Sequence, residues 1–236
     1  MLAPADRVIM ISGANRGIGK AVADRLLEQG YRLSLGARDT ATLDAAFGPE
    51  DDRHAHFHYD ALARGTDADW VAATAERFGR IDGLINNAGT SNSFSIEAGD
   101  EADLDLLWTI NCKGPLFLTR AVLPHLCKSG TGRIVNVASM SGKRVRNENV
   151  AYNMTKHALI ALSHGTRRIG WDDGVRTTTV CPSFVRTDLT ANSTKVMPEE
   201  MIQPEDFAEV VALAMALPNT AAMAEMLVNC RLEDLF

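Results

Sequence analysis

Short apolar runs alternate along this chain with longer segments in which apolar side chains recur at helical spacing. The first run, residues 7–12, precedes a segment in which Ile18, Val22 and Leu26 share one helical face. Further runs predict strands at residues 32–36, 55–59, 83–86, 132–137, 177–181 and 225–228. Helices are predicted between them, a short one after Asp39 as its cap and longer ones at residues 17–29, 66–78, 101–127, 150–171 and 204–217.

Strands that alternate with helices favour one architecture. We expect an α/β fold, a single doubly wound parallel sheet of about seven strands with helices on both faces. Thr66 and Asp69 resemble a capping box at the start of their helix, with Asp where Glu is usual. Pro115 has no backbone N–H and lies inside the helix 101–127, so this helix is expected to bend in the middle.

The composition is that of an ordinary globular chain. It has 236 residues, 46% hydrophobic and 23% charged, so residues 1–236 are expected to form one domain. The net charge of −6 argues against a nucleic-acid partner, whose phosphates need a basic surface. Since no apolar run is long enough to span a bilayer, no membrane partner is expected and a cytoplasmic location is the first expectation.

Cysteine and histidine positions argue against a metal centre. The 4 cysteines lack zinc spacing and are expected to be reduced thiols. His54, His56 and His58 alternate at strand period, so their side chains share one face of a strand. They are either part of a metal site or ordinary positions near a sheet edge. The second interpretation is favoured because no further Cys or His completes a ligand set.

A glycine-rich turn joins the first predicted strand to the first helix. Gly13, Gly17 and Gly19 follow the pattern G-x-x-x-G-x-G. Without side chains in the way, backbone N–H groups can approach a pyrophosphate, and the helix N-terminus adds a partial positive charge. The turn is either a phosphate cradle or a simple tight turn, and its place at the first strand-to-helix junction favours the cradle.

Charge after the second strand indicates which dinucleotide is bound. An acidic residue there would bind a free 2′-hydroxyl and repel a 2′-phosphate. The chain has Ala37 and Arg38 instead, and Arg16 lies inside the glycine loop. Because two arginines can converge on a 2′-phosphate, we expect NADP(H) to be preferred over NAD(H). The alternative is that both arginines are solvated.

Polar side chains suited to proton transfer lie between Ser139 and Lys156. Tyr152 and Lys156 share one face of their predicted helix. An ammonium close to a phenol stabilises the phenolate, which favours general acid–base chemistry. Ser139 follows the fifth strand, and its hydroxyl can donate to a substrate oxygen. The alternative is an amphipathic helix with a surface Tyr and Lys, which the glycine loop and Ser139 together argue against.

Asn111 is the fourth candidate for the catalytic set. Pro115, four residues later, cannot donate the helix hydrogen bond that the Asn111 carbonyl would normally accept. A water molecule in that place would connect Asn111 to Lys156 and form a proton relay. The alternative is a simple proline kink with no role in chemistry.

Together these motifs resemble the classical short-chain dehydrogenase/reductase family over nearly the whole chain. The glycine loop matches, with Ser12 where the family usually has Thr. Two further segments resemble the parts that bind the adenine amine and border the adenosine, Asp60-Ala61 and Asn86-Asn87-Ala88-Gly89. The segment that meets the nicotinamide is matched by residues 182–187, with Ser183 in place of the usual Gly. The catalytic tetrad is matched by Asn111, Ser139, Tyr152 and Lys156.

The resemblance implies a Rossmann-like oxidoreductase that interconverts a carbonyl and a secondary alcohol by hydride transfer. Tyr152 is the implied general acid/base. Lys156 stabilises its phenolate and holds the nicotinamide ribose, Ser139 positions the substrate oxygen, and Asn111 supports the water relay. A homodimer or homotetramer formed through the two long helices is also implied. The implied cofactor contacts are Gly13, Asn15, Arg16, Gly17, Ile18, Gly19, Arg38, Asp60, Ala61, Asn87, Ala88, Gly89, Tyr152, Lys156, Pro182, Val185 and Thr187.

The substrate is expected to be a small molecule that the irregular segments select, residues 90–100, 140–151 and 187–203. Lys143, Arg144 and Arg146 either attract an acidic substrate, such as a 3-oxo acid or its thioester, or are solvated. Met197 and Met201 either line an adaptable apolar pocket or pack the last segment. Other ketones, aldehydes and quinones stay open as substrates.

A second functional class is compatible with the same fold. An NADP(H)-sensing regulatory protein would bind the cofactor and a partner without performing chemistry. The complete tetrad argues against this class. At the end of the chain, Leu235 and Phe236 are expected to pack on a neighbouring subunit.

Overall fold

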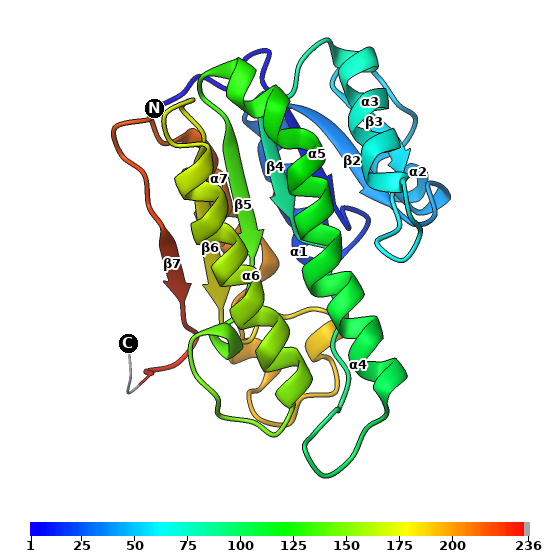
Figure 1. Cartoon of the computed structure of the whole chain (residues 1–236), viewed down its shortest axis with the longest axis vertical. Coiled ribbons are helices and arrows are strands. Elements are labelled where there is room, and N and C mark those ends of the chain that lie inside the picture. Colours follow the sequence, from blue (N-terminus) through cyan, green and yellow to red (C-terminus); the bar gives the residue numbers. More distant parts are fainter. Residues whose placement is uncertain (234–236) are drawn as a thin grey trace.

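Seven parallel strands form the centre of the protein, in the order β3-β2-β1-β4-β5-β6-β7 (Figure 1). The structure is a computed structural model and describes residues 1–233. The strands are β1 (Val8–Ser12), β2 (Arg32–Ala37), β3 (His54–His58), β4 (Gly83–Asn86), β5 (Arg133–Val137), β6 (Arg176–Pro182) and β7 (Glu225–Val228). The predicted doubly wound parallel sheet is confirmed.

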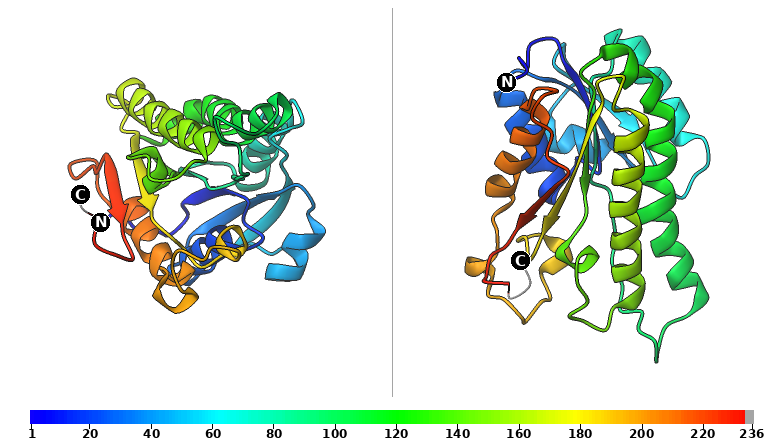
Figure 2. Two further views of the ribbon diagram at one scale, coloured as in Figure 1. Left: turned by 90° about the horizontal axis from the view of Figure 1, so that it is seen from below. Right: turned by 60° about the vertical axis from the view of Figure 1, so that its left-hand side comes forward.

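Helices cover both faces of the sheet (Figure 2). One face carries α1 (Gly17–Glu28), α2 (Ala41–Phe47) and α7 (Pro204–Ala216). The other carries α3 (Thr66–Phe78), α5 (Gly114–Ser129) and α6 (Val150–Ile169), and α4 (Glu101–Trp108) continues α5 beyond the sheet. Because both faces are shielded, every residue of β1 is buried, which explains why this strand is a continuous apolar run.

The long helix predicted at residues 101–127 is interrupted at its centre by a π-helical turn. α4 ends at Trp108, a π-helical turn spans Thr109–Lys113, and α5 begins at Gly114. Pro115 lies in the first turn of α5, where its missing N–H interrupts the regular helical hydrogen bonds. Insertions of this π type often occur at functional positions in helices, and this one contains Asn111.

The predicted capping box at Thr66 is wrong. Gly65 precedes α3 with a φ of 90°, a left-handed conformation that glycine adopts without strain. Thr66 is therefore inside the helix, and its hydroxyl donates to the Asp60 carbonyl at 2.8 Å. Asp39 also lies one residue outside the cap position of α2, although its carboxylate accepts from the Ala41 N–H at 3.0 Å.

The carboxyl ends of all strands meet at one edge of the sheet, at the lower end of Figure 1. The segments 90–100, 140–149 and 187–203 gather at this edge, and the chain that follows β7 runs to the same end. Every candidate catalytic residue lies in or beside these segments. Within residues 1–233, no helix combines the length and the apolar character needed to cross a membrane.

Candidate active site

Close main-chain contacts shape the glycine loop between β1 and α1. Gly13 and Gly17 have φ values of 66° and 54°, in the left-handed region. A Cβ atom on Gly19 would lie 2.1 Å from the Gly13 carbonyl oxygen and 2.5 Å from Asn87 Nδ2. The first turn of α1 has neither a side-chain cap nor an acidic residue, so nothing on the helix competes with an anion for its N–H groups. This geometry fits a pyrophosphate.

Ser12 and Asn87 join the glycine loop to the segment after β4. Ser12 Oγ accepts from the N–H groups of Asn87 and Ala88, both at 3.0 Å. Asn87 Nδ2 donates to the carbonyls of Ser12 and Gly13, at 2.9 and 3.0 Å. These hydrogen bonds hold the predicted adenosine-binding segment directly beside the predicted phosphate-binding loop.

The two arginines expected to bind a 2′-phosphate have different surroundings. Arg38 is exposed after β2, and its side chain forms no ion pair within residues 1–233. Arg16 Nη1 lies 2.7 Å from Asp188 Oδ2, and the two side chains are 68% and 76% exposed. An exposed pair of this kind contributes at most about 1 kcal/mol, so Arg16 can turn toward a phosphate. Asp60 is half-buried after β3 and accepts from the Leu62 N–H at 3.0 Å.

α6 places Tyr152 and Lys156 at the centre of this edge. Lys156 is 7% exposed, and its ammonium donates to the Val137 carbonyl at 3.0 Å. Lys156 Nζ lies 5.5 Å from the centroid of the Tyr152 ring. A Cβ atom on Gly89 would be 3.8 Å from Lys156 Nζ and 3.4 Å from Asn111 Oδ1. The structure therefore places Lys156 and Asn111 beside Gly89, with the Tyr152 ring next to Lys156.

Asn111 is fixed in the π-helical turn between α4 and α5. Its Oδ1 accepts from the Thr90 N–H and its Nδ2 donates to the Thr90 carbonyl, both at 2.9 Å. Nδ2 also lies 3.2 Å from Thr155 Oγ1 in α6. The side chain thus anchors the start of segment 90–100, a role that the sequence did not indicate. Beside it, burial raises the pKa of Cys112 to about 11 despite the charge of Lys156, so this cysteine stays a neutral thiol.

Ser139 follows β5 and begins a short turn at Met140–Gly142. Its Oγ accepts from the Ser141 N–H at 3.1 Å, which leaves its own proton to donate. The turn packs against α6, since a Cβ atom on Gly142 would lie 2.7 Å from the Lys156 carbonyl oxygen. Ser139 is therefore held beside the backbone of the helix that carries Tyr152.

The segment after β6 lies against the glycine loop. A Cβ atom on Gly17 would be 3.3 Å from Thr187 Cγ2. Ser183, which stands where the resembling family usually has Gly, accepts from the Cys230 N–H through its Oγ at 2.9 Å. This substitution adds a link to the chain beyond β7. The remaining predicted cofactor contacts lie along the same edge, half-buried or buried: Asn15, Ile18, Ala61, Ala88, Pro182 and Val185.

The cations of loop 140–149 pair with acidic residues near the end of the chain. Lys143 Nζ lies 2.6 Å from Glu225 Oε2, and Arg144 Nη2 and Nε bind the two carboxylate oxygens of Glu233 at 2.6 and 3.0 Å. Arg146 Nη1 lies 3.1 Å from Glu233 Oε2. The interpretation that these charges are solvated is wrong for Lys143 and Arg144, whose side chains are 22% and 11% exposed. No pattern in the sequence marks either glutamate as a partner of this loop.

The histidines of β3 lie at the edge of the sheet. His54 Nδ1 is 2.9 Å from Asp51 Oδ1, His56 Nδ1 is 2.7 Å from Asp44 Oδ1, and His58 is exposed. In the part of the chain that the structure describes, no three His, Cys, Asp or Glu side chains are arranged to hold a metal ion. The expected C-terminal contact of Leu235 and Phe236 lies outside the described residues.

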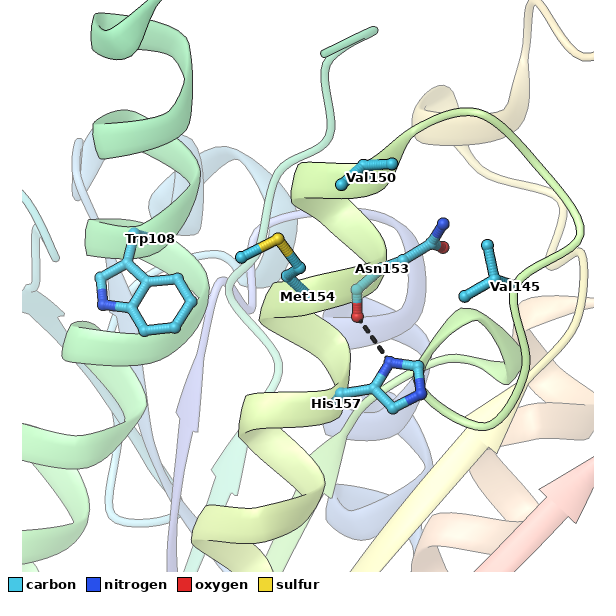
Figure 3. A pocket seen from close by; sticks show the side chains of 6 residues that line it. All are labelled: Trp108, Val145, Val150, Asn153, Met154 and His157. Atoms are coloured by element: carbon cyan, nitrogen blue, oxygen red, sulfur yellow. Dashed lines mark hydrogen bonds between the residues drawn. The ribbon is translucent and has the colours of Figure 1, made fainter. Parts of the chain in front are cut away.

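Two cavities flank the start of α6. One, of about 360 Å³, lies between α4, α6 and the loop before α6 (Figure 3). It is lined by Trp108, Val145, Val150, Asn153, Met154 and His157. The other, of about 520 Å³, is lined by Val145, Arg146, Asn147, Glu148 and Lys195, so it joins loop 140–149 to segment 187–203.

The two methionines of segment 187–203 differ in burial. Met201 is 5% exposed and packs into the protein, whereas Met197 is 61% exposed. The Val185–Ile202 bridge pairs this segment with the chain after β6. Packing is therefore the role of Met201, and neither methionine lines the two cavities described above.

The fold and the arrangement at the edge of the sheet agree with a family assignment. The chain belongs to the short chain dehydrogenase family, whose sequence pattern matches residues 7–197. The resemblance inferred from the glycine loop and the Ser, Tyr and Lys positions is confirmed.

Two curated relatives bear on the function. The chain is 47% identical over 229 residues to agropine synthesis reductase of Rhizobium rhizogenes, and the matched region covers 97% of this chain and 53% of that protein. It is 31% identical over 228 residues to an uncharacterized oxidoreductase of Staphylococcus saprophyticus, and this match covers 95% of this chain and 97% of that protein. The chain thus spans about half the length of agropine synthesis reductase.

Two solved structures share the fold. A 3-ketoacyl-(acyl-carrier-protein) reductase from Brucella melitensis, complexed with NADH, has a TM-score of 0.87 at 24% identity and covers 96% of this chain and 98% of its own. ElxO with NADP bound has a TM-score of 0.86 at 23% identity, and the match covers 95% of this chain and 97% of that chain. The two cofactors differ, so the shared fold alone does not select between NAD(H) and NADP(H).

Proposed function

We propose that this protein is an NADP(H)-dependent oxidoreductase that interconverts a carbonyl and a secondary alcohol by hydride transfer. The observation that carries the proposal is the fixed position of Lys156, which is buried, bonded to the Val137 carbonyl and 5.5 Å from the Tyr152 ring. An ammonium beside a phenol stabilises the charge that remains when the phenol gives up its proton. Tyr152 is therefore the proposed general acid/base.

Each member of the tetrad has a proposed role. Tyr152 donates a proton to the carbonyl oxygen in reduction and removes it from the alcohol in oxidation. The Ser139 hydroxyl donates to the same oxygen. Because the Asn111 side chain is engaged with Thr90, its main-chain carbonyl is the part left to hold a water that leads to Lys156. The nicotinamide, when bound, supplies or accepts the hydride.

The residues present fit a dinucleotide. The glycine loop and the uncapped start of α1 would hold the pyrophosphate, and residues 87–89 with Asp60 would border the adenosine. Arg38, exposed and without an ion pair in the described residues, would bind the 2′-phosphate with Arg16 as a second contact. These arginines support NADP(H) over NAD(H).

Two classes of substrate are compatible with the proposed reaction. A 3-oxoacyl or 3-hydroxy acid is one candidate, and another ketone, an aldehyde or a quinone is the other. The loop arginines support the acidic candidate less than the sequence suggested, because Arg144 is already paired with Glu233. The polar cavity lined by Arg146 and Lys195 is the region that would select among these substrates.

The proposal is tested by NADPH oxidation over a panel of ketones, aldehydes, quinones and 3-oxo esters, with the reverse reaction followed on the matching alcohols. We expect at least one carbonyl to be reduced to its alcohol, identified by mass spectrometry. Tight NADPH binding without turnover of any compound, in either direction, would favour an NADP(H)-sensing protein instead and overturn the proposed activity.

We also propose that residues 1–236 form one NADP-binding domain that assembles as a homodimer or homotetramer. The exposed faces of α4, α5 and α6 support assembly, since Trp108, Phe117 and Met154 are 37%, 42% and 49% exposed. Large apolar side chains in such numbers on neighbouring helices are typical of a subunit contact. Light scattering would test this, and a monomer at assay concentration would contradict it.

A further inference from the structure

The chain that follows β7 contacts three different parts of the candidate site. Residues 230–233 reach the turn after β6, the segment 187–203 and the loop 140–149. The contacts are the Cys230 N–H to Ser183 Oγ at 2.9 Å, Arg231 Nη2 to Glu200 Oε2 at 3.0 Å, and Glu233 Oε1 to Arg144 Nη2 at 2.6 Å. Four consecutive residues thus join segments that are far apart in the sequence.

The contact between Arg144 and Glu233 is the strongest of the three. Arg144 binds both carboxylate oxygens through Nη2 and Nε, and the two side chains are 11% and 9% exposed. The pair of Arg231 and Glu200 is 52% and 58% exposed, and such exposed pairs contribute little. The hydrogen bond from Arg144 lowers the pKa of Glu233, so its carboxylate is charged at neutral pH.

A second pair holds the same loop. Lys143 lies 2.6 Å from Glu225 of β7, and His164 of α6 lies 2.7 Å from the other oxygen of that carboxylate. Burial opposes the charge on Glu225, but hydrogen bonds from Lys143 and His164 outweigh it and lower its pKa. The cationic part of the loop is therefore fixed from the C-terminal side at both Lys143 and Arg144.

The loop leads directly into the helix of Tyr152. Asn147 Oδ1 accepts from the Asn149 N–H at 3.0 Å and from Asn153 Nδ2 at 3.1 Å. Asn149 Oδ1 caps α6 by accepting from the Tyr152 N–H at 3.2 Å. Since Arg144 lies only a few residues earlier, displacement of the loop would disturb the capped turn that carries Tyr152.

Resting on the proposed function, we propose that residues 230–233 form a clasp that fixes loop 140–149, with Glu233 and Arg144 as positioning residues for the substrate side of the site. In this proposal, the loop arginines hold loop 140–149 in place instead of binding substrate. An acidic substrate that used Arg144 would first have to displace Glu233.

Hydrogen–deuterium exchange of the full chain tests the clasp without any substrate. In Glu233→Gln, we expect amides of residues 141–149 to exchange about tenfold faster than in the wild type, because the loop opens more often. The matched control is Glu209→Gln, which removes a 2.7 Å ion pair with Arg25 between α1 and α7. Equal protection of residues 141–149 in the wild type and in Glu233→Gln would overturn the proposal.

Kinetics with a carbonyl that the panel identifies gives the second readout. In Glu233→Gln, KM for that carbonyl should rise about tenfold and kcat change less than about threefold, with the NADPH Kd unchanged. Glu233→Asp should recover part of the loss, and Arg144→Gln combined with Glu233→Gln should be no worse than either alone. A lower KM in Glu233→Gln would mean that Glu233 competes with substrate, and would overturn the clasp. If no carbonyl is turned over, the proposed activity fails while the exchange result still decides the clasp.

Discussion

The proposed cofactor half and the proposed substrate half of the site keep their shapes by different means. In the cofactor half, main-chain atoms approach so closely that a Cβ atom on Gly19 would lie 2.1 Å from the Gly13 carbonyl oxygen. In the substrate half, loop 140–149 is held by charged side chains, with Arg144 and Glu233 joined across 89 positions of the sequence. The shape of the glycine loop depends on the absence of side-chain atoms, whereas the shape of loop 140–149 depends on charged side chains that each have a partner.

This difference predicts how each half tolerates change. A carbon added to Gly19 has nowhere to go, because the Gly13 carbonyl group that it would meet is backbone and cannot rotate away. An ion pair, in contrast, joins two side chains that can be exchanged for another matched pair without a change of the backbone.

Among the changes that distinguish the two halves, the largest effect is expected from Gly19→Ala. The new methyl group would collide with the Gly13 carbonyl and reshape the loop, so NADPH binding should weaken about 100-fold, or about 2.8 kcal/mol. Fluorescence titration of NADPH measures this. The control is Gly165→Ala in α6, where an added Cβ meets nothing within 4 Å and the helix should be unharmed. An unchanged Kd in Gly19→Ala would show that the loop does not hold the cofactor.

An intermediate effect is expected from Arg38→Asp. The substitution replaces a cation that would bind the 2′-phosphate by an anion that repels it, while a free 2′-hydroxyl is tolerated. The ratio of kcat/KM for NADPH to that for NADH should fall by about 10–100-fold, since one to two charge-assisted bonds are lost. Arg168→Asp, an exposed charge change on α6, serves as the control. A wild type that prefers NADH would refute the assignment of Arg38.

The smallest effect is the pH dependence of the clasp. Because the hydrogen bond from Arg144 lowers the pKa of Glu233 in the folded state, its stabilising contribution is complete above the ordinary carboxyl pKa of about 4.3 and is lost as the pH falls through the folded value. Glu233→Gln should therefore be less stable than the wild type by about 1 kcal/mol at pH 7. Urea unfolding should show this difference shrinking toward zero in acid. A difference that is constant with pH would contradict the role of this carboxylate.

The glycine loop and several strands could be predicted because their signals are local. The spacing of Gly13, Gly17 and Gly19 indicates a loop, and β4 and β7 have the predicted bounds. Pro115 indicated that the long helix is interrupted, since a missing N–H acts within one turn. The π-helical form of the interruption depends on packing and had no sequence signal.

The substrate half could not be predicted to the same depth because its partners are distant. No residue near Arg144 in the sequence points to Glu233, its partner in the structure. The sequence of the loop was equally compatible with a substrate site and with solvated charges. The wrong capping box at Thr66 has a related cause. Gly65 adopts a left-handed φ of 90° just before it, so the helix begins at Thr66 and the hydroxyl turns back to Asp60.

The central claim of the proposed function is that the Tyr152 phenol moves the proton, whereas the glycine loop and the arginines provide most of the cofactor binding. The most direct test is Tyr152→Phe, which removes only the phenolic oxygen. We predict that kcat falls by about 10²–10⁴-fold, the range that general acid–base catalysis supplies, while the NADPH Kd stays within about twofold of the wild type. A Tyr152→Phe variant that keeps kcat close to the wild-type value, on a carbonyl that the wild type reduces, would contradict the account.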